Sequence, residues 1–170
     1  MSWLRAALVG PWLTCAGCFM FGGGGDDDPI EPPAELVEFT PSLSVERVWS
    51  ARVGGGSELL RLALAPATDG STIYAGGHDG QVVGLDAATG RRVWATRTDL
   101  PLAAGPGFGD GVLAFGTNDG DLITLEAGTG EERWRLQVGG EVLASPAIGG
   151  GIVVLRTVDG RLRGYSILDG

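Results

Sequence analysis

The sequence predicts an all-β fold, a β-propeller of four-stranded antiparallel blades, and three observations support this prediction. The chain holds 31 glycines in 170 residues, which favours short strands joined by tight turns. An x-Asp-Gly tripeptide recurs at equal intervals, at 78–80, 118–120 and 158–160. Each period also holds about four short runs of strand character, and four antiparallel strands per period of this length are typical of a propeller blade.

The expected strands are short and follow one another closely. Asp-Gly between two apolar runs indicates a hairpin, because glycine accepts the positive φ that tight turns require. No amphipathic stretch is long enough for a crossover helix, so a parallel βα architecture is disfavoured. In the second period the expected strands lie near 102–108, 112–116, 120–125 and 131–137. We assign residues 44–170 to a partial propeller, with a closing strand near Trp49, blades at about 59–98 and 99–138, and an incomplete blade over 139–170.

The third period stops before its fourth strand, at Gly170. Propellers typically have four to eight blades. We therefore expect the chain to be the N-terminal part of a longer propeller, truncated to roughly three blades. An N-terminal strand such as the one around Trp49 often completes the last blade of a closed propeller.

The N-terminal residues predict export and lipid attachment. Residues 1–17 combine one positive charge, a short apolar stretch and small residues, as in a secretory signal peptide. The sequence Ala16-Gly17-Cys18 resembles the lipobox of bacterial lipoproteins, which implies cleavage before Cys18 and acylation of that residue. Two or more acyl chains hold a protein stably on a bilayer. Residues 18–43 comprise this cysteine and an acidic, proline-rich stretch with little to bury, which indicates a disordered tether.

The two cysteines leave alternatives open. Cys15 is a poorer acyl acceptor than Cys18, because bulkier residues precede it. An ordinary cleaved signal with incidental cysteines is the other alternative. A C-x-x-C pair also occurs in zinc and redox sites, but no second pair follows and His78 is the only histidine. We therefore assign no metal-binding residue.

The charge of the chain bears on its partners. A formal net charge of −9 disfavours nucleic acid, because a phosphate backbone needs a basic surface. Arginines occur in pairs at alternate positions of the expected strands, so that each pair shares one strand face. We interpret these faces as solvated, with a partner-binding patch as the alternative. The pairs are Arg133 with Arg135 and Arg161 with Arg163.

Tryptophans mark the last strand of each period. The segments Leu-Asp-Ala-Ala-Thr-Gly-Arg-Arg-Val-Trp (85–94) and Leu-Glu-Ala-Gly-Thr-Gly-Glu-Glu-Arg-Trp (125–134) resemble the tryptophan-docking repeat of quinoprotein-type propellers, the PQQ-like repeat. In that family the tryptophan ring of one blade packs against a neighbouring blade, where a large flat ring buries much area. The resemblance implies blade-docking roles for Trp49, Trp94, Trp134, Gly90 and Gly130.

The order in which the N-terminal segments precede the repeats resembles one particular family. A lipobox, an acidic tether, Leu-Val-Glu-Phe-Thr-Pro (36–41) and Val-Glu-Arg-Val-Trp (45–49) precede the repeats, as in the BamB family. The resemblance implies a non-catalytic, eight-bladed scaffold without a cofactor, lipid-anchored at the periplasmic face of the outer membrane. Its implied partners are the POTRA domains of BamA, the rest of the assembly machinery and unfolded outer-membrane proteins. The BamA-contacting loops are expected beyond residue 170, so no contact residue is assigned.

Two other functions compete with this one. A quinoprotein dehydrogenase would use pyrroloquinoline quinone and Ca²⁺, but such enzymes usually have an adjacent cysteine pair, and no cysteine follows residue 18. His78 and the Asp-Gly turns are better interpreted as solvated hairpin residues than as a catalytic site. A lipoprotein propeller with some other partner is the third possibility.

Overall fold

The computed structural model describes residues 33–56 and 62–170. The expected signal peptide, both cysteines and most of the expected tether lie outside these residues. The chain divides into two units, 1–43 and 44–170. In the first unit, the described residues 33–43 form neither helix nor strand, and all of them are exposed.

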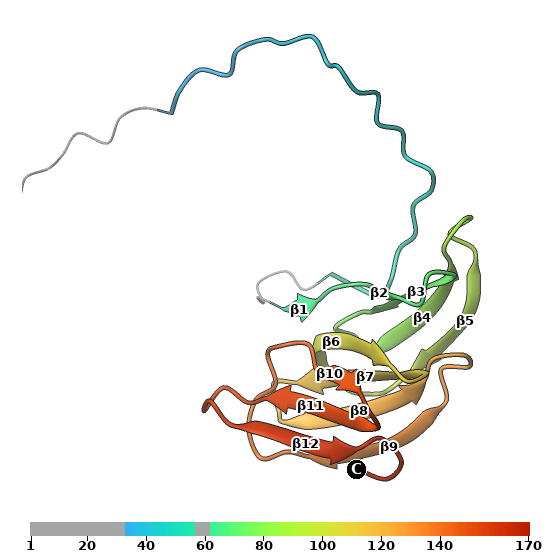
Figure 1. The fold of residues 1–170 in the computed structure, drawn as a ribbon, viewed down its shortest axis with the longest axis vertical. Coiled ribbons are helices and arrows are strands. Elements are labelled where there is room, and N and C mark those ends of the chain that lie inside the picture. Colours follow the sequence, from blue (N-terminus) through green and yellow to red (C-terminus); the bar gives the residue numbers. More distant parts are fainter. Residues whose placement is uncertain (1–32, 57–61) are drawn as a thin grey trace, which may run out of the picture. The chain divides into compact units, whose positions relative to one another are not determined.

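The second unit consists of three sheets of consecutive strands (Figure 1). Sheet 1 comprises β2 (Ala67–Thr68), β3 (Thr72–Gly76), β4 (Gln81–Asp86) and β5 (Arg92–Arg97). Sheet 2 comprises β6 (Leu102–Gly109), β7 (Val112–Thr117), β8 (Asp121–Glu126) and β9 (Glu132–Gln137), together with the short β1 (Ala63–Leu64). Sheet 3 comprises β10 (Ala147–Gly149), β11 (Ile152–Arg156) and β12 (Leu162–Ser166).

The predicted all-β class is confirmed. Neighbouring strands within each period pair antiparallel in chain order, and the described residues contain no helix. No membrane-spanning helix therefore occurs in the described part of the chain. The Asp-Gly glycines have φ values of +82°, +83° and +85° at 80, 120 and 160. An L-residue side chain disfavours this conformation, which explains why glycine recurs at these turns.

Two details differ from the sequence-based expectation. The segment around Trp49 forms no strand, and none of the described strands pairs with it. The innermost strand of the first period is split into β1 and β2. The first part, β1, pairs in parallel with β6 of sheet 2, whereas β2 pairs with β3 of sheet 1.

The core lies between the sheets, in two layers that we call seam 1–2 and seam 2–3. Each sheet turns alternate residues of a strand toward each of its neighbours, as the strand pleat requires. Both seams bury aliphatic and aromatic side chains, and burial of this apolar area stabilises the stack. Seam 1–2 contains Tyr74, Val82, Leu102, Leu113, Phe115, Ile123, Leu125 and Ala127. Seam 2–3 contains Ala104, Val112, Ala114, Leu122, Val138, Val142, Val153, Leu155 and Ile167.

Candidate functional site

One tryptophan in sheet 1 and one in sheet 2 form a hydrogen bond to the next sheet along the chain. The indole Nε1 of Trp94 in sheet 1 donates a hydrogen bond of 3.0 Å to the Ala127 carbonyl of sheet 2. Trp134 in sheet 2 makes the same bond, 3.1 Å long, to the Ile167 carbonyl of sheet 3. The two acceptors are separated by one repeat period, as the two tryptophans are, so one contact repeats at both seams.

A glycine lies against the indole ring of Trp94, and another lies against the ring of Trp49. A Cβ added to Gly130 would come within 2.5 Å of the Trp94 ring, and one added to Gly90 would come within 2.6 Å of the Trp49 ring. Gly90 and Gly130 also have positive φ values of +69° and +76°. Both the close approach of the ring and the backbone conformation therefore require glycine.

Trp49 makes the same contact from a segment that is not a strand. Its Nε1 donates a 2.9 Å hydrogen bond to the Ala87 carbonyl of sheet 1. Nearby, the Gly54 amide donates a 2.8 Å bond to the Gln81 side chain. The structure thus brings all five residues that the resemblance singled out into one repeated contact: Trp49 with Gly90, Trp94 with Gly130, and Trp134 with the turn of sheet 3.

The loop surface beside the first Asp-Gly turn carries a polar depression. It is lined by His78, Asp79, Arg97, Asp99, Leu100 and Pro101. His78 Nδ1 lies 2.8 Å from the Leu102 carbonyl, and Arg97 forms an exposed ion pair with Asp79 at 3.4 Å. These charges are paired with one another or turned to solvent, and no three His, Cys, Asp or Glu side chains of the described residues lie together as a metal site requires.

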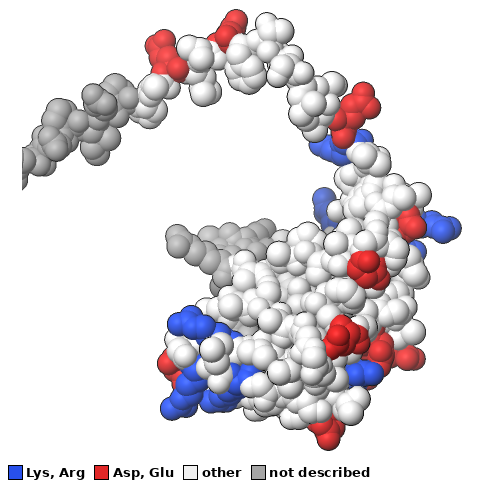
Figure 2. Space-filling view, viewed as in Figure 1, with Lys and Arg blue, Asp and Glu red and all other residues white. Residues whose placement is uncertain are grey.

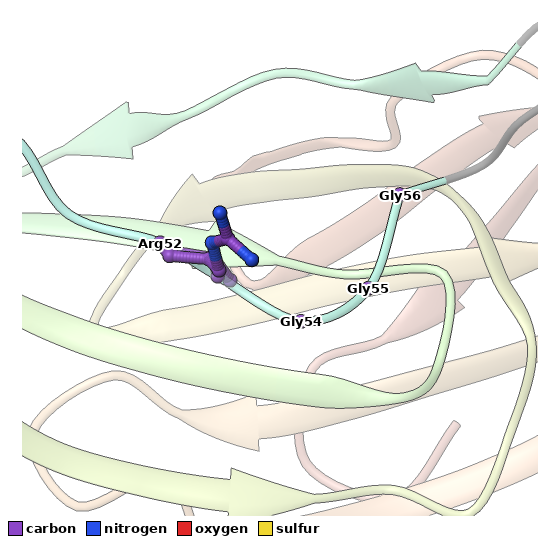
Figure 3. Close-up of a pocket in the computed structure, with 5 residues that line it drawn as sticks. Arg52, Gly54, Gly55 and Gly56 are labelled. Atoms are coloured by element: carbon purple, nitrogen blue, oxygen red, sulfur yellow. The ribbon is translucent and has the colours of Figure 1, made fainter.

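A second depression lies along the stretch that follows Trp49. It is lined by residues 52–56, of which three are glycines. Figure 3 shows Arg52 projecting from this stretch, while Gly54, Gly55 and Gly56 continue it beside the strands. The lining of this depression therefore consists of backbone, one valine side chain and the guanidinium of Arg52. None of these groups could act as a general base.

The paired arginines occupy two different environments. Arg133 and Arg135 lie on the exposed face of β9, where each forms an ion pair, with Glu126 and Glu132 respectively. The hydrogen bond from Arg135 lowers the pKa of Glu132. Figure 2 shows arginines also gathered at the end of the unit where Figure 1 places the β11–β12 turn.

Arg163 differs from the expected solvated arginine. It pairs in register with Leu155 of seam 2–3 and is half-buried, with its Nη1 3.7 Å from the position of a Cβ on Gly139. Arg161, which precedes β12, is exposed. The two arginines therefore do not form one solvated patch, because Arg163 lies on the face of β12 that turns toward sheet 2.

Asp69, an acidic residue of the turn between β2 and β3, has no repeated motif that would single it out in the sequence. Asp69 accepts hydrogen bonds from the Ser71 and Thr72 amides, at 2.8 and 2.7 Å, and from the Tyr74 hydroxyl at 2.7 Å. The Tyr74 bond is the main cause that lowers the pKa of Asp69 well below its usual value, and the amide bonds add to it. Burial, and then the bond to Asp69, raises the pKa of Tyr74.

This depressed pKa predicts an acid dependence. Asp69→Ala is expected to lower the urea midpoint at pH 7, because the ionised carboxylate is stabilised only in the folded hairpin. The deficit relative to the wild type should shrink as the pH falls below the unfolded-state pKa of about 3.9, since folding then gains progressively less from ionisation of Asp69. Urea titrations of both proteins between pH 7 and pH 3 measure this difference, with Asp119→Ala as the control in an exposed turn. A deficit that stays constant over this range would contradict the assignment.

Comparison with known proteins places the sheets in a family. The family model described as "Outer membrane protein assembly factor BamB" matches residues 39–100 and 85–170, which together cover 39–170. The chain belongs to the BamB family. A BamB from Bordetella pertussis is 39% identical over 101 residues, which cover 59% of this chain and 25% of the relative. The chain thus spans about a quarter of the length of that curated relative.

Solved structures agree on the fold. The crystal structure of BamB from Moraxella catarrhalis matches with a TM-score of 0.57 and 31% identity, over 64% of this chain and 33% of that one. This match confirms the predicted propeller class, with the three sheets as part of a larger BamB propeller. A quinohemoprotein alcohol dehydrogenase from Pseudomonas putida matches with a TM-score of 0.54 and 21% identity, over 65% of this chain and 20% of that one. At this identity the likeness concerns the fold alone.

Proposed function

We propose that the protein is a non-catalytic scaffold of the outer-membrane β-barrel assembly machinery, one that binds the periplasmic POTRA domains of BamA and assists the insertion of barrel proteins. The observation that carries this proposal is the family match over residues 39–170, since the relative from Bordetella pertussis is named an outer membrane protein assembly factor. The repeated tryptophan contact fits this role, because it fixes neighbouring sheets to one another through indole hydrogen bonds. A stack held in this way presents a preorganised surface to a partner.

Membrane attachment is the second part of the proposal. Residues 1–17 act as the signal peptide, and Cys18 carries the acyl chains that hold the protein on the periplasmic face of the outer membrane. Residues 18–43 then tether the propeller. Support comes from the lipobox-like Ala16-Gly17-Cys18 and from residues 33–43, which are exposed and form no regular secondary structure.

Co-purification with BamA tests the partner. The tagged full-length protein, extracted from outer membranes in mild detergent, is expected to retain BamA at near-stoichiometric amounts. Cys18→Ser should move the protein from the membrane fraction to the soluble periplasm, whereas Cys15→Ser is the matched control and should leave it in the membrane. Recovery without BamA at any salt concentration would contradict the scaffold proposal. Reduction of a redox dye that depends on added pyrroloquinoline quinone would support the dehydrogenase instead.

A further inference from the structure

The polar depression beside the first Asp-Gly turn is lined by side chains that the repeat itself does not require. The docking tryptophans and the turn glycines recur from one period to the next, because the fold depends on them. Three polar residues of the depression instead differ from their equivalents one period later: His78 from Asn118, Arg97 from Gln137 and Asp99 from Gly139. Since sheet 2 forms without these side chains, their presence beside sheet 1 calls for a different explanation.

Asp99 occupies a position that glycine holds in the other two segments. Each docking tryptophan is followed at the same spacing by a residue with positive φ, which is +61° at Gly54, +57° at Asp99 and +68° at Gly139. Glycine adopts this conformation readily, whereas the side chain of any other residue disfavours it. A carboxylate is thus present at a place where the backbone alone favours glycine.

The Asp99 carboxylate is exposed and forms no ion pair with the described residues. The other carboxylate of the depression, that of Asp79, is paired with Arg97, whose Nη1 also donates a 2.9 Å hydrogen bond to the Asp79 carbonyl. The guanidinium of Arg135, which donates to the loop from sheet 2, is paired with Glu132. The lining of the depression therefore carries one negative charge that its own guanidinium does not neutralise.

His78 supplies a second acceptor to the same depression. Its Nδ1 lies 2.8 Å from the Leu102 carbonyl, and because a carbonyl oxygen can only accept, Nδ1 carries the proton of this bond. In the neutral imidazole Nε2 is then an acceptor, and it has no hydrogen-bond partner among the described residues. A ligand group that is positively charged and donates hydrogen bonds would match both Nε2 and the Asp99 carboxylate.

The loop that carries Asp99 is held in place by its neighbours in the chain. Thr98 is buried, and its amide donates a 2.9 Å hydrogen bond to the Gly80 carbonyl. Leu100 packs against seam 1–2, and its carbonyl oxygen lies 2.9 Å from the position of a Cβ on Gly80. Pro101 lines the depression and is exposed. The carboxylate is therefore preorganised, which limits the ordering cost of binding.

We propose that this depression binds the side chain of an arginine or lysine presented by a partner protein. The cationic group meets the Asp99 carboxylate and Nε2 of His78, and its aliphatic stem covers the ring of Pro101, as long charged side chains commonly cover apolar surface. The site belongs to sheet 1 and its following loop, since the equivalent loop of sheet 2 has Gly139 and no carboxylate at this position. This inference is independent of the BamA proposal.

Fluorescence anisotropy with labelled peptides tests the ligand. The full-length protein is titrated with a glycine-flanked arginine peptide and with its citrulline counterpart, which has nearly the same shape and no charge. The arginine peptide should bind at least about tenfold more tightly, because only the guanidinium forms a charge-assisted bond with Asp99. Equal affinities for the two peptides would overturn the proposal. So would the absence of arginine binding, or tighter binding of a glutamate peptide.

A charge variant with a matched control tests the site. Asp99→Asn should weaken binding of the arginine peptide by about tenfold or more, since the amide keeps the size of the side chain and removes its charge. Asp119→Asn removes the same charge from an exposed turn of sheet 2 and should change the affinity little. If both variants lose affinity equally, the net charge of the protein attracts the peptide and the proposal is wrong.

Asp99→Gly separates binding from folding. This variant should lose the preference for arginine over citrulline without a decrease in Tm, since Gly54 and Gly139 show that glycine fits the backbone at this position. Thermal unfolding followed by circular dichroism measures the Tm of the full-length variant beside the wild type. A decrease in Tm would assign the Asp99 carboxylate to the stability of the fold and overturn the proposal.

Discussion

Trp94→Ala is expected to lower the free energy of unfolding of the chain by about 3 kcal/mol or more, in the range of tryptophan truncations in protein cores. The ring stacks on Tyr74 at a centroid distance of 6.2 Å, lies against Gly130 and donates to the Ala127 carbonyl. Truncation removes the packing and leaves that carbonyl without its indole donor. Trp94→Phe keeps part of the packing and should cost less. Urea unfolding followed by circular dichroism measures both losses.

A series of glycine variants separates the indole contact from backbone strain. Gly130 combines a φ of +76° with the Trp94 contact, Gly111 has the same φ of +76° with open space around it, and Gly128 has neither feature. Gly128→Ala should be nearly neutral, as Ala88 at the equivalent place of the first repeat indicates. Gly111→Ala should cost about 1–2 kcal/mol from the left-handed backbone alone, and Gly130→Ala should cost clearly more. Equal losses for Gly111→Ala and Gly130→Ala would show that the ring contact contributes nothing.

The sequence was most informative where the structure is local. The Asp-Gly turns and the strand runs of the second period could be located because hairpins depend on neighbouring residues. The observed β6, β7, β8 and β9 begin and end within about one residue of the expected runs, which lies inside the usual uncertainty of strand ends. The tryptophan positions were evident from their regular spacing, although the family resemblance, and not the spacing, supplied their role.

Contacts between distant residues could not be predicted in the same way. The parallel pairing of β1 with β6 depends on how two sheets approach each other, and the link from Asp69 to Tyr74 depends on a side chain reaching back across a hairpin. One overlooked signal could have located the innermost strands: Pro66, Pro106 and Pro146 recur with the same period as the Asp-Gly turns. The prediction of a solvated Arg163 was wrong. Two arginines at alternate positions suggest a solvated strand face, whereas β12 turns the Arg163 side chain toward sheet 2.

Phe115→Ala is expected to have the other large effect, a loss of about 3–5 kcal/mol. Phe115 is 0% exposed in seam 1–2 and is the largest fully buried side chain of the described residues. Its neighbours belong to two sheets, so the cavity cannot close without moving one sheet against the other. Phe115→Leu should cost far less, since Leu155 fills the equivalent position of the next repeat. Phe39→Ala is the control, because that ring is 80% exposed and its loss should be nearly neutral.

A double-mutant cycle tests whether the phenylalanine ring is what requires glycine at position 76. Gly76→Ala alone should be destabilising, since the added Cβ would lie 2.6 Å from Phe115 Cε1. In the Phe115→Leu background the ring edge is gone, and the same substitution should cost less by about 1 kcal/mol or more, as expected for residues in direct contact. Unfolding free energies of the four proteins give the coupling. Additive losses would mean that Leu102 Cδ1, 3.3 Å from the same Cβ position, sets the requirement instead.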